Sequence, residues 1–415
     1  MIGLDWNTPV GDDLPRSAFR YRGFVLYWSA RFLTAFSTQI TSVAVGWQIY
    51  DQTRDPFLLG LVGLVQFAPA LALVLVTGSA ADRFNRRRIM GLCIAAEAAC
   101  VLSLLALAVG APRAIGPMFA ILAVFGVARA FFAPAVQSLA ANLVPPVAFA
   151  NAVAWNASSW QTAMVVGPVA GGLLYGLTPI AAYGTSALWL AVASVLTFLI
   201  PKPPQKTSTE PSSPDVLLAG FRYIWSQPVV LGAISVDLFA VLLGGTTALL
   251  PAFARDVLDV GPWGLGLLRS APGIGAVAMG IWLVRHPIRD HVGRVMFAAV
   301  TVFGMAITVF GLSTATWLSI SALAIMGAAD MISVYIRATL IQLATPDDVR
   351  GRVSAVNTVF IGASNELGEF RAGAMAAAIG IVPSVVVGGL GTLLVAALGA
   401  RVFPELLKTR RLAGR

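Results

Sequence analysis

The sequence predicts an all-α membrane protein with 12 transmembrane helices in two pseudo-symmetric six-helix bundles, and three observations lead to this fold class. Hydrophobic residues make up 58% of the 415 positions and charged residues only 11%, whereas soluble domains carry about 25% charged residues. Apolar runs recur along the whole chain, and a helix of about 20 residues crosses the roughly 30 Å hydrocarbon core of a bilayer. One sustained polar stretch, residues 201–215, separates six such runs from six others.

The expected spans are all apolar and long enough to cross a membrane. In chain order they are residues 24–49, 56–79, 89–110, 115–137, 150–176, 179–200, 228–252, 262–284, 294–312, 317–342, 353–379 and 381–402. The first span follows the polar segment GDDLPRSAFRYRG and lacks a small-residue cleavage site, so we expect it to remain as a transmembrane helix.

These spans divide the chain into three parts. Residues 1–200 form an N-terminal six-helix bundle, 201–227 a cytoplasmic linker with an interfacial segment, and 228–415 a C-terminal six-helix bundle. The stretch PKPPQKTSTEPSSPD has the composition of an extended, solvated linker. The following VLLAGFRYIWSQP has apolar and aromatic residues at near-helical spacing, which predicts a segment along the inner membrane surface.

The distribution of positive charge predicts the orientation. If the N-terminus lies inside, the N-terminal segment, the even-numbered connections and the C-terminal tail hold most of the 28 Lys and Arg residues, whereas the outer connections hold Arg54, Arg113 and Arg255. This bias matches the positive-inside rule, so both termini are expected in the cytoplasm. Membrane topology thus explains the net charge of +9, and no nucleic-acid partner is expected.

Cysteine and histidine give no indication of a metal site or a cofactor. Cys93 and Cys100 lie seven residues apart in one predicted helix, about 10 Å along its axis, which is too far for a mutual disulfide. His286 and His291 lie in a basic connection without a neighbouring cysteine or a carboxylate pattern. We therefore expect neither a metal nor a cofactor.

The two halves resemble each other in sequence, which suggests a duplication. Identical residues occur in the two halves at two fixed spacings. A spacing of 201 residues aligns Gly126 with Gly327, Leu139 with Leu340, Asn156 with Asn357, Gly167 with Gly368 and Gly172 with Gly373. A spacing of 206 residues aligns Pro56 with Pro262, Gly60 with Gly266 and Leu61 with Leu267. Six-helix halves related by an axis along the membrane normal are found in alternating-access transporters.

The connection after the second span reads GSAADRFNRRRIM and resembles the signature loop of the major facilitator superfamily. The residues that carry this resemblance are Gly78, Asp82, Arg83, Arg86 and Arg87. Asn85 departs from the pattern, because the family usually has glycine there. The resemblance implies a cytoplasmic gate, in which an acid and several guanidinium groups form contacts between the halves that break and reform. The alternative is a basic loop that serves only to orient the chain.

Further stretches resemble exporters of this superfamily. The segment VVGPVAGGLLYG resembles the exporter-associated G-P-x-x-G-G motif, carried by Gly167, Pro168, Gly171 and Gly172. Small residues at this spacing let two helices approach, although ordinary helix packing is the alternative. LLAGFRYIWSQP and TPDDVRGRVSAVNTVFIGASN are similar to the siderophore-exporter branch. That resemblance implies the major facilitator fold and proton-driven export of a secondary metabolite across a bacterial-type cytoplasmic (inner) membrane.

Charged residues inside the predicted spans are candidates for the transport site, because ionised groups are costly there. The repeat pairs Arg31 with Asp237 at offset 206, and Arg129 with Asp330 at offset 201. We expect two electrostatic couplings across the halves, with Arg129 near the midplane, where many proton-coupled members of the superfamily carry an arginine. The alternative is that each charge pairs within its own half.

The segment NELGEFRAG adds three charges to the eleventh span. Glu366 and Glu369 are three residues apart and share a helix face, whereas Arg371 points largely away from them. Two carboxylates on one face in a low dielectric disfavour joint ionisation. We expect both to face a hydrated cavity as proton or cationic-substrate sites and Arg371 to form a structural salt bridge, with a static packing network of all three as the alternative.

Three more charged residues receive no firm role from the sequence. Arg269 is interpreted as lying near the outer surface and Arg337 as capping the inner end of the tenth span, with a basic cavity residue that suits an anionic catecholate-type substrate as the alternative. Glu97 is left unassigned. Proton-driven drug exporters often have an acid in the first span, whereas this chain has Arg31. Proton coupling would therefore use acids of the second half.

The sequence thus favours a secondary active transporter that exports a small amphipathic metabolite, siderophore or drug by proton-coupled alternating access. The expected partners are the small-molecule substrate, protons and the lipid bilayer, and the chain is expected to be a monomer. The alternatives are an uptake or uniport carrier and a membrane receptor or scaffold that keeps the fold without transporting. The sequence contains no P-loop, nucleophilic triad or metal cluster, so no enzymatic activity is expected.

Overall fold

The computed structural model describes residues 17–110, 115–140, 142–202 and 221–410, and within these ranges the secondary structure is entirely helical. The elements of the first half are η1 (Ala18–Arg20), α1 (Arg22–Thr53), α2 (Pro56–Ala72), α3 (Val74–Arg83), α4 (Arg86–Gly110), α5 (Ile115–Ala140), α6 (Pro146–Leu177) and α7 (Pro179–Leu199). Those of the second half are α9 (Pro228–Gly244), η2 (Thr247–Leu249), α10 (Leu250–Ala252), η3 (Phe253–Val257), α11 (Pro262–Arg285), α12 (Val292–Leu312), α13 (Thr316–Ala344), α14 (Asp347–Ile379), α15 (Ile381–Val402) and α16 (Pro404–Lys408).

Each of the 12 predicted spans is confirmed as helical, and prolines define many of the helix starts. Proline occupies one of the first two positions of several helices, where its missing N–H costs no hydrogen bond: Pro56, Pro146, Pro179, Pro228, Pro262 and Pro404. Side chains complete two of these starts, since Asp55 accepts a hydrogen bond from the Phe57 amide and Thr178 accepts one from the Ala181 amide. Such caps satisfy amides that have no partner within the helix.

The described residues include eight helices long and apolar enough to cross a membrane, together with the shorter apolar α2. The helices α1, α6 and α14 are longer still, with 32, 32 and 33 residues. Large apolar side chains cover the outside of the molecule, among them Leu177, which is 74% exposed, and Val284, which is 84% exposed. Such a surface is unfavourable in water and favourable against lipid.

Two predicted spans are interrupted. The second is divided at Leu73 into α2 and α3, four residues after Pro69 within α2. The seventh ends at Gly244 and continues through η2, α10 and η3. Glycines at 244 and 245 weaken the helix there, and Pro251 lacks the N–H that would continue the hydrogen-bond ladder.

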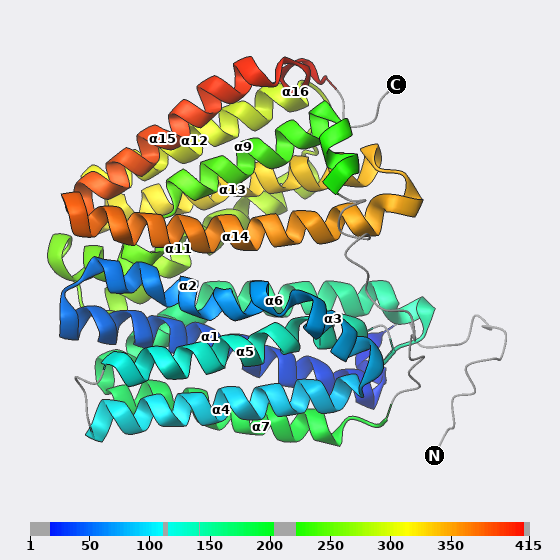
Figure 1. Cartoon of the computed structure of the whole chain (residues 1–415), viewed down its shortest axis with the longest axis vertical. Helices are drawn as coiled ribbons and strands as arrows, with labels where there is room; N and C mark the ends of the chain where they lie inside the picture. Colours follow the sequence, from blue (N-terminus) through cyan, green and yellow to red (C-terminus); the bar gives the residue numbers. More distant parts are fainter. Residues whose placement is uncertain (1–16, 111–114, 141, 203–220, 411–415) are drawn as a thin grey trace.

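The helices form two bundles that lie one above the other (Figure 1). In the first bundle α4 packs against α5 and α7, and α1 packs against α6 and α7; in the second, α12 packs against α13 and α15. We call the end where α3 and α16 lie the terminal end, and the end where α1 finishes and η3 lies the far end. Residues 203–220 of the predicted linker lie outside the described residues, and Cys93 and Cys100 are free, as the spacing predicted.

Two pairs of glycines join the bundles, one between α2 and α14 and one between α6 and α11. A Cβ atom at Gly60 would lie 3.0 Å from the Cα of Gly373, and a Cβ at Gly172 would lie 3.1 Å from the Cα of Gly266. Contacts this close require the absence of a side chain. The sequence repeat aligns these four glycines, Gly60 with Gly266 and Gly172 with Gly373, so the pseudo-symmetry of the halves relates the two contacts.

The exporter-type motif of α6 surrounds one of these contacts. A side chain at Gly171 would meet the backbone of Ile40 in α1, whereas the carbonyl of Pro168 lies against Gly266 of α11. The motif therefore lets α6 approach its own bundle on one face and the opposite bundle on another.

We predict that Gly172→Val opens the far end of the molecule, because overfilling this contact costs about 1–3 kcal/mol in the closed arrangement. Gly176→Val is the matched control, since Gly176 lies one turn away in α6 and a Cβ atom there would have no neighbouring atom within 4 Å. The measurement is the distance between spin labels at Leu177 and Trp317, which are 74% and 71% exposed, in a background lacking the native cysteines. A longer distance in the Gly172 variant alone is expected; equal distances in both variants contradict the prediction.

Candidate functional site

A cavity of about 720 Å³ lies between the two bundles. Its walls come from α1, α2, α5 and α6 on one side and from α9, η2, α11, α13 and α14 on the other. Seven charged residues line it, namely Arg129, Asp237, Arg269, Asp330, Arg337, Glu366 and Glu369. Polar side chains such as Gln39, Gln66 and Asn365 lie beside these charges and apolar residues complete the walls, and a cavity of this size at a domain interface is a typical ligand site.

The structure brings five of the six predicted cavity residues together. Arg129, Asp237, Asp330, Glu366 and Glu369 line the cavity, and their roles in proton coupling or substrate binding stay predictions. The sixth is Arg31, which is not among the lining residues. Its guanidinium donates to the hydroxyl of Tyr27, one turn earlier in α1, at 3.3 Å.

The expected coupling of Arg31 to Asp237 is wrong in this structure. Asp237 of α9 instead forms an ion pair with Arg337 of α13 and accepts a hydrogen bond from the Ser333 hydroxyl at 2.9 Å. All three residues belong to the second bundle, so for Asp237 the alternative of pairing within one half holds. Arg337 is 5% exposed, and the expectation that it caps the inner end of its helix is therefore also wrong.

The expected coupling of Arg129 to Asp330 is replaced by a different arrangement. Among the described residues these two form no ion pair, although both line the cavity. The Arg129 guanidinium lies 6.0 Å from the centre of the Phe125 ring. It interacts electrostatically with Glu366 across the cavity and with Glu97 in its own bundle.

Arg269 connects the two bundles next to the acidic pair of α14. It extends from α11, donates to the carbonyl of Ser42 in α1 at 3.0 Å, and interacts electrostatically with both Glu366 and Glu369. The interpretation that Arg269 lies near the outer surface is thus wrong, because it lines the cavity. A sequence gives the depth of a residue in a helix but not the direction in which its side chain points.

Arg371 completes the broken end of α9. Its Nε donates to the carbonyl of Leu242 at 3.0 Å and its Nη2 to that of Leu243 at 2.6 Å. These carbonyls lack helical partners because α9 ends at Gly244. The expected salt bridge of Arg371 is therefore replaced by hydrogen bonds to backbone, and the charge stabilises a helix C-terminus.

The predicted cytoplasmic gate lies at the terminal end, between α3 and α4. Arg86 donates to the carbonyls of Ala81 at 3.0 Å and Ser138 at 3.4 Å, and Arg87 donates to that of Ile200 at 2.5 Å. These contacts join α3, α4, α5 and the end of α7, all in the first bundle.

The other gate residues add less. Gly78 and Arg83 belong to α3, while the side chain of Asp82 lies outside the described part. Asn85 accepts a hydrogen bond from the Arg88 amide at 3.2 Å, and in this way it caps the start of α4. A gate role for Gly78, Asp82, Arg83, Arg86 and Arg87 thus stays a prediction.

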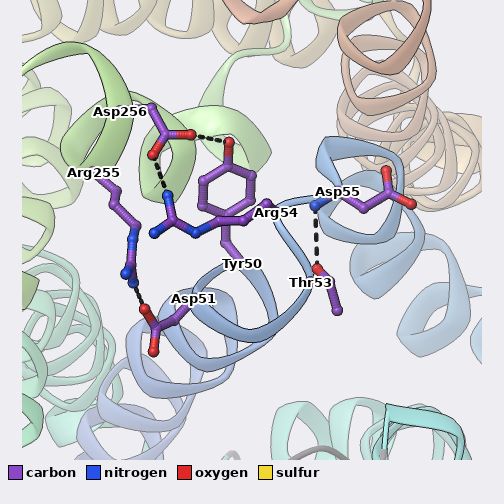
Figure 2. A network of polar contacts seen from close by, with 7 residues as sticks. All are labelled: Tyr50, Asp51, Thr53, Arg54, Asp55, Arg255 and Asp256. Carbon is purple, nitrogen blue, oxygen red and sulfur yellow. Dashed lines mark hydrogen bonds and ion pairs between the residues drawn. The ribbon is translucent and has the colours of Figure 1, made fainter.

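Polar contacts that the sequence did not predict join the two bundles at the far end (Figure 2). Arg255 of η3 forms an ion pair with Asp51 of α1. Arg54 pairs with Asp256 at 2.6 Å, and the Tyr50 hydroxyl donates to Asp256 at 2.5 Å. We call these five residues the far-end network.

The backbone explains how Arg54 reaches the opposite bundle. It is the C-cap of α1 with φ 54° and ψ 22°, a left-handed conformation, and its amide donates to the carbonyl of Tyr50. The sequence held a partial signal for this network, because the dipeptide Arg-Asp at 54–55 and at 255–256 supplies Arg54, Arg255 and Asp256. Asp55 lies outside the network, and the same dipeptide occurs at 289–290. The copies at 54–55 and 255–256 each follow the apolar part of the first helix of their bundle.

We predict that removing one partner of the buried Asp237–Arg337 pair destabilises the protein more than removing both. Arg337→Gln leaves a buried carboxylate uncompensated, at a cost of about 3–5 kcal/mol, whereas replacing both partners by apolar residues of similar volume is close to neutral. Thermal unfolding in detergent of Arg337→Gln, of Asp237→Leu with Arg337→Met, and of the control Arg31→Gln measures this. If Arg31→Gln lowers the melting temperature as much as Arg337→Gln does, the assignment of the pair is incorrect.

Comparisons with known proteins identify the family. The model of the Major Facilitator Superfamily matches residues 27–369. The enterobactin exporter EntS of Escherichia coli O1:K1 is 28% identical over 399 residues, which cover 92% of each chain, and EntS of Citrobacter koseri gives the same values. The siderophore-exporter resemblance noted in the sequence is therefore confirmed.

Solved structures agree in fold. A bacterial homologue of the lysosomal transporter Spinster, in an inward-facing and occupied conformation, has a TM-score of 0.75 at 16% identity, covering 93% of this chain and 98% of that one. A bacterial homologue of the iron transporter ferroportin, in an inward-facing state, has a TM-score of 0.70 at 16% identity, covering 94% and 99%. The chain belongs to the Major Facilitator Superfamily, and it is a multi-pass membrane transport protein with that fold and not an enzyme.

Proposed function

We propose that the protein exports a small amphipathic metabolite of the siderophore class from the cytoplasm in exchange for protons. The observation that carries the proposal is the charged cavity between the two bundles, with Glu366, Glu369 and Asp330 facing Arg129 and Arg269. The direction and the substrate class rest on the relatives, which are named as enterobactin exporters.

The charge balance of the cavity supports coupling to protons. Asp237 and Arg337 neutralise each other, which leaves three carboxyl groups opposite two guanidinium groups. With all of them ionised the cavity has one excess negative charge, which is unfavourable in a low dielectric. One proton, or one cationic group of a substrate, removes this excess. Release of either one would then favour a different arrangement of the bundles.

The contacts between the bundles support alternating access. The far-end network and the two glycine pairs join the halves toward the far end. With the terminal end in the cytoplasm, as the positive charges favour, these contacts close the arrangement toward the outside. An exporter takes up its cargo in that state, and entry of a proton from outside requires the far-end network to break.

Transport into and out of proteoliposomes tests the proposal, with enterobactin as the probe. We expect a pH gradient to drive its movement and a protonophore to abolish this. Glu366→Gln and Glu369→Gln should each lose gradient-driven movement because a neutral amide does not carry the proton. Glu405→Gln in the exposed α16 is the matched control and should behave as the unaltered protein.

The remaining outcomes of this experiment decide between the other functions. Equilibration of enterobactin that ignores the gradient indicates a uniport or uptake carrier. Binding without movement indicates a receptor. Gradient-driven movement that survives in both glutamine variants contradicts the assignment of Glu366 and Glu369.

We also predict that the far-end network holds the outside closed. Arg255→Asp places like charges at the Asp51 pair and should open the far end. Because these side chains are partly exposed, we expect a loss of about 1 kcal/mol, or roughly a fivefold change in the ratio of closed to open molecules. The labels at Leu177 and Trp317 report it. Adding Asp51→Arg restores the pair and should restore the distance; a double variant as open as the single one contradicts the prediction.

A further inference from the structure

Glu97 of α4 is a buried carboxyl group that the cavity mechanism leaves without a role. It is 1% exposed and lies outside the residues that line the cavity. Neither of its carboxylate oxygens has a hydrogen-bond partner among the described residues. A carboxyl group in such a place costs several kcal/mol when it is ionised without a partner. Its presence therefore requires either a nearby positive charge or a bound proton.

In the part of the chain that the structure describes, one positive charge interacts with Glu97. On its own helix, Cys93 and Cys100 lie one turn before and one turn after it, and both are free thiols. The helix α7, which packs on α4, contains no charged residue. The helix α5 packs on the other side and carries Arg129, which interacts electrostatically with Glu97.

Arg129 at the same time faces the opposite bundle. It lines the cavity and interacts electrostatically with Glu366 of α14, which itself lies near Glu369 and Arg269. Among the described residues Arg129 makes no close ion pair with either Glu97 or Glu366. The Arg129 guanidinium is thus shared between Glu97, which moves with it in the first bundle, and Glu366, which belongs to the second bundle.

We propose that Glu97 is a positioning residue that competes with Glu366 for Arg129 and thereby regulates the proton exchange at Glu366. This proposal rests on the proposed function and deepens it. The distance from Glu97 to Arg129 lies within one bundle and is conserved when the bundles rock, whereas the distance from Arg129 to Glu366 changes. As the bundles separate around Glu366, Glu97 retains Arg129 in its own half. Glu366 is then released from its positive partner and binds a proton.

The sign of the effect follows from this competition. Neutralising Glu97 removes the competitor, so Arg129 attracts Glu366 more strongly and the arrangement in which the two lie close is stabilised. In Glu97→Gln we therefore expect the ratio of far-end-closed to far-end-open molecules to rise at least about fivefold, the lower range of coupling between linked sites. We also expect the pH at which gradient-driven transport is half-maximal to fall, because more acid is needed to protonate Glu366 while it is held by Arg129.

The experiment measures the far-end distance between labels at Leu177 and Trp317 in detergent, without substrate. The variants are Glu97→Gln, Glu97→Leu, Arg129→Gln and the combination of Glu97→Gln with Arg129→Gln. Both single changes at Glu97 should raise the closed fraction, since both remove the charge. In the Arg129→Gln background, Glu97→Gln should have no further effect, because Glu97 acts through Arg129.

Two results would overturn the proposal. One is a shift caused by Glu97→Leu alone, which indicates packing and not charge. The other is a far-end distance that Glu97→Gln leaves unchanged, or that Glu97→Gln changes equally in the presence and absence of Arg129→Gln. Because the distance measurement needs neither substrate nor a pH gradient, it distinguishes failure of this proposal from failure of export as the function.

Discussion

Ionised side chains in the middle of a membrane protein must find partners, and here they must do so at an interface that also has to open. This constraint determines much of the molecule. The seven charged residues around the cavity neutralise one another almost completely, and six of them belong to the second bundle. There Asp237 pairs with Arg337, and Arg269 interacts with Glu366 and Glu369. Arg129 of the first bundle faces Glu366 across the cavity. Any movement of the bundles therefore changes the electrostatic energy, which lets a proton or a charged substrate select an arrangement.

The sequence predicted the fold well because the bilayer imposes strong rules on composition and length. Every predicted span is helical, although two of them are interrupted, and the division into two halves followed from one polar segment. The partners of the buried charges could not be predicted in this way. The repeat assigned Arg31 to Asp237 because they occupy equivalent positions, yet the direction of a side chain depends on the rotation of its helix. Arg31 contacts Tyr27 in its own helix, and Asp237 contacts a helix of its own bundle.

Local interruptions were missed for a related reason. Arg371 appeared as a charge in need of an acid, but its partners are two carbonyl groups, which exist only because α9 ends at Gly244. The glycines show that a sequence repeat does carry information about the contacts between the bundles. The alignment identified Gly60, Gly172, Gly266 and Gly373 as equivalent in pairs, and the structure joins them crosswise between the bundles. Symmetry in sequence thus located the contact surfaces, although it did not say which surface meets which.

Alternating access requires that contacts within a bundle persist and that contacts between the bundles break, and the burial of the ion pairs agrees with this. Contacts that stay within the second bundle are buried: Asp237 and Arg337 have side chains 7% and 6% exposed, and separating them would cost about 3–5 kcal/mol. The ion pairs that cross between bundles have side chains between 27% and 51% exposed, where such pairs contribute about 0–1 kcal/mol. A strong ion pair thus stabilises the inside of the second bundle, whereas the ion pairs between the bundles are weak. An equilibrium between two arrangements can then be shifted by a single proton, because about 1.4 kcal/mol changes a ratio tenfold.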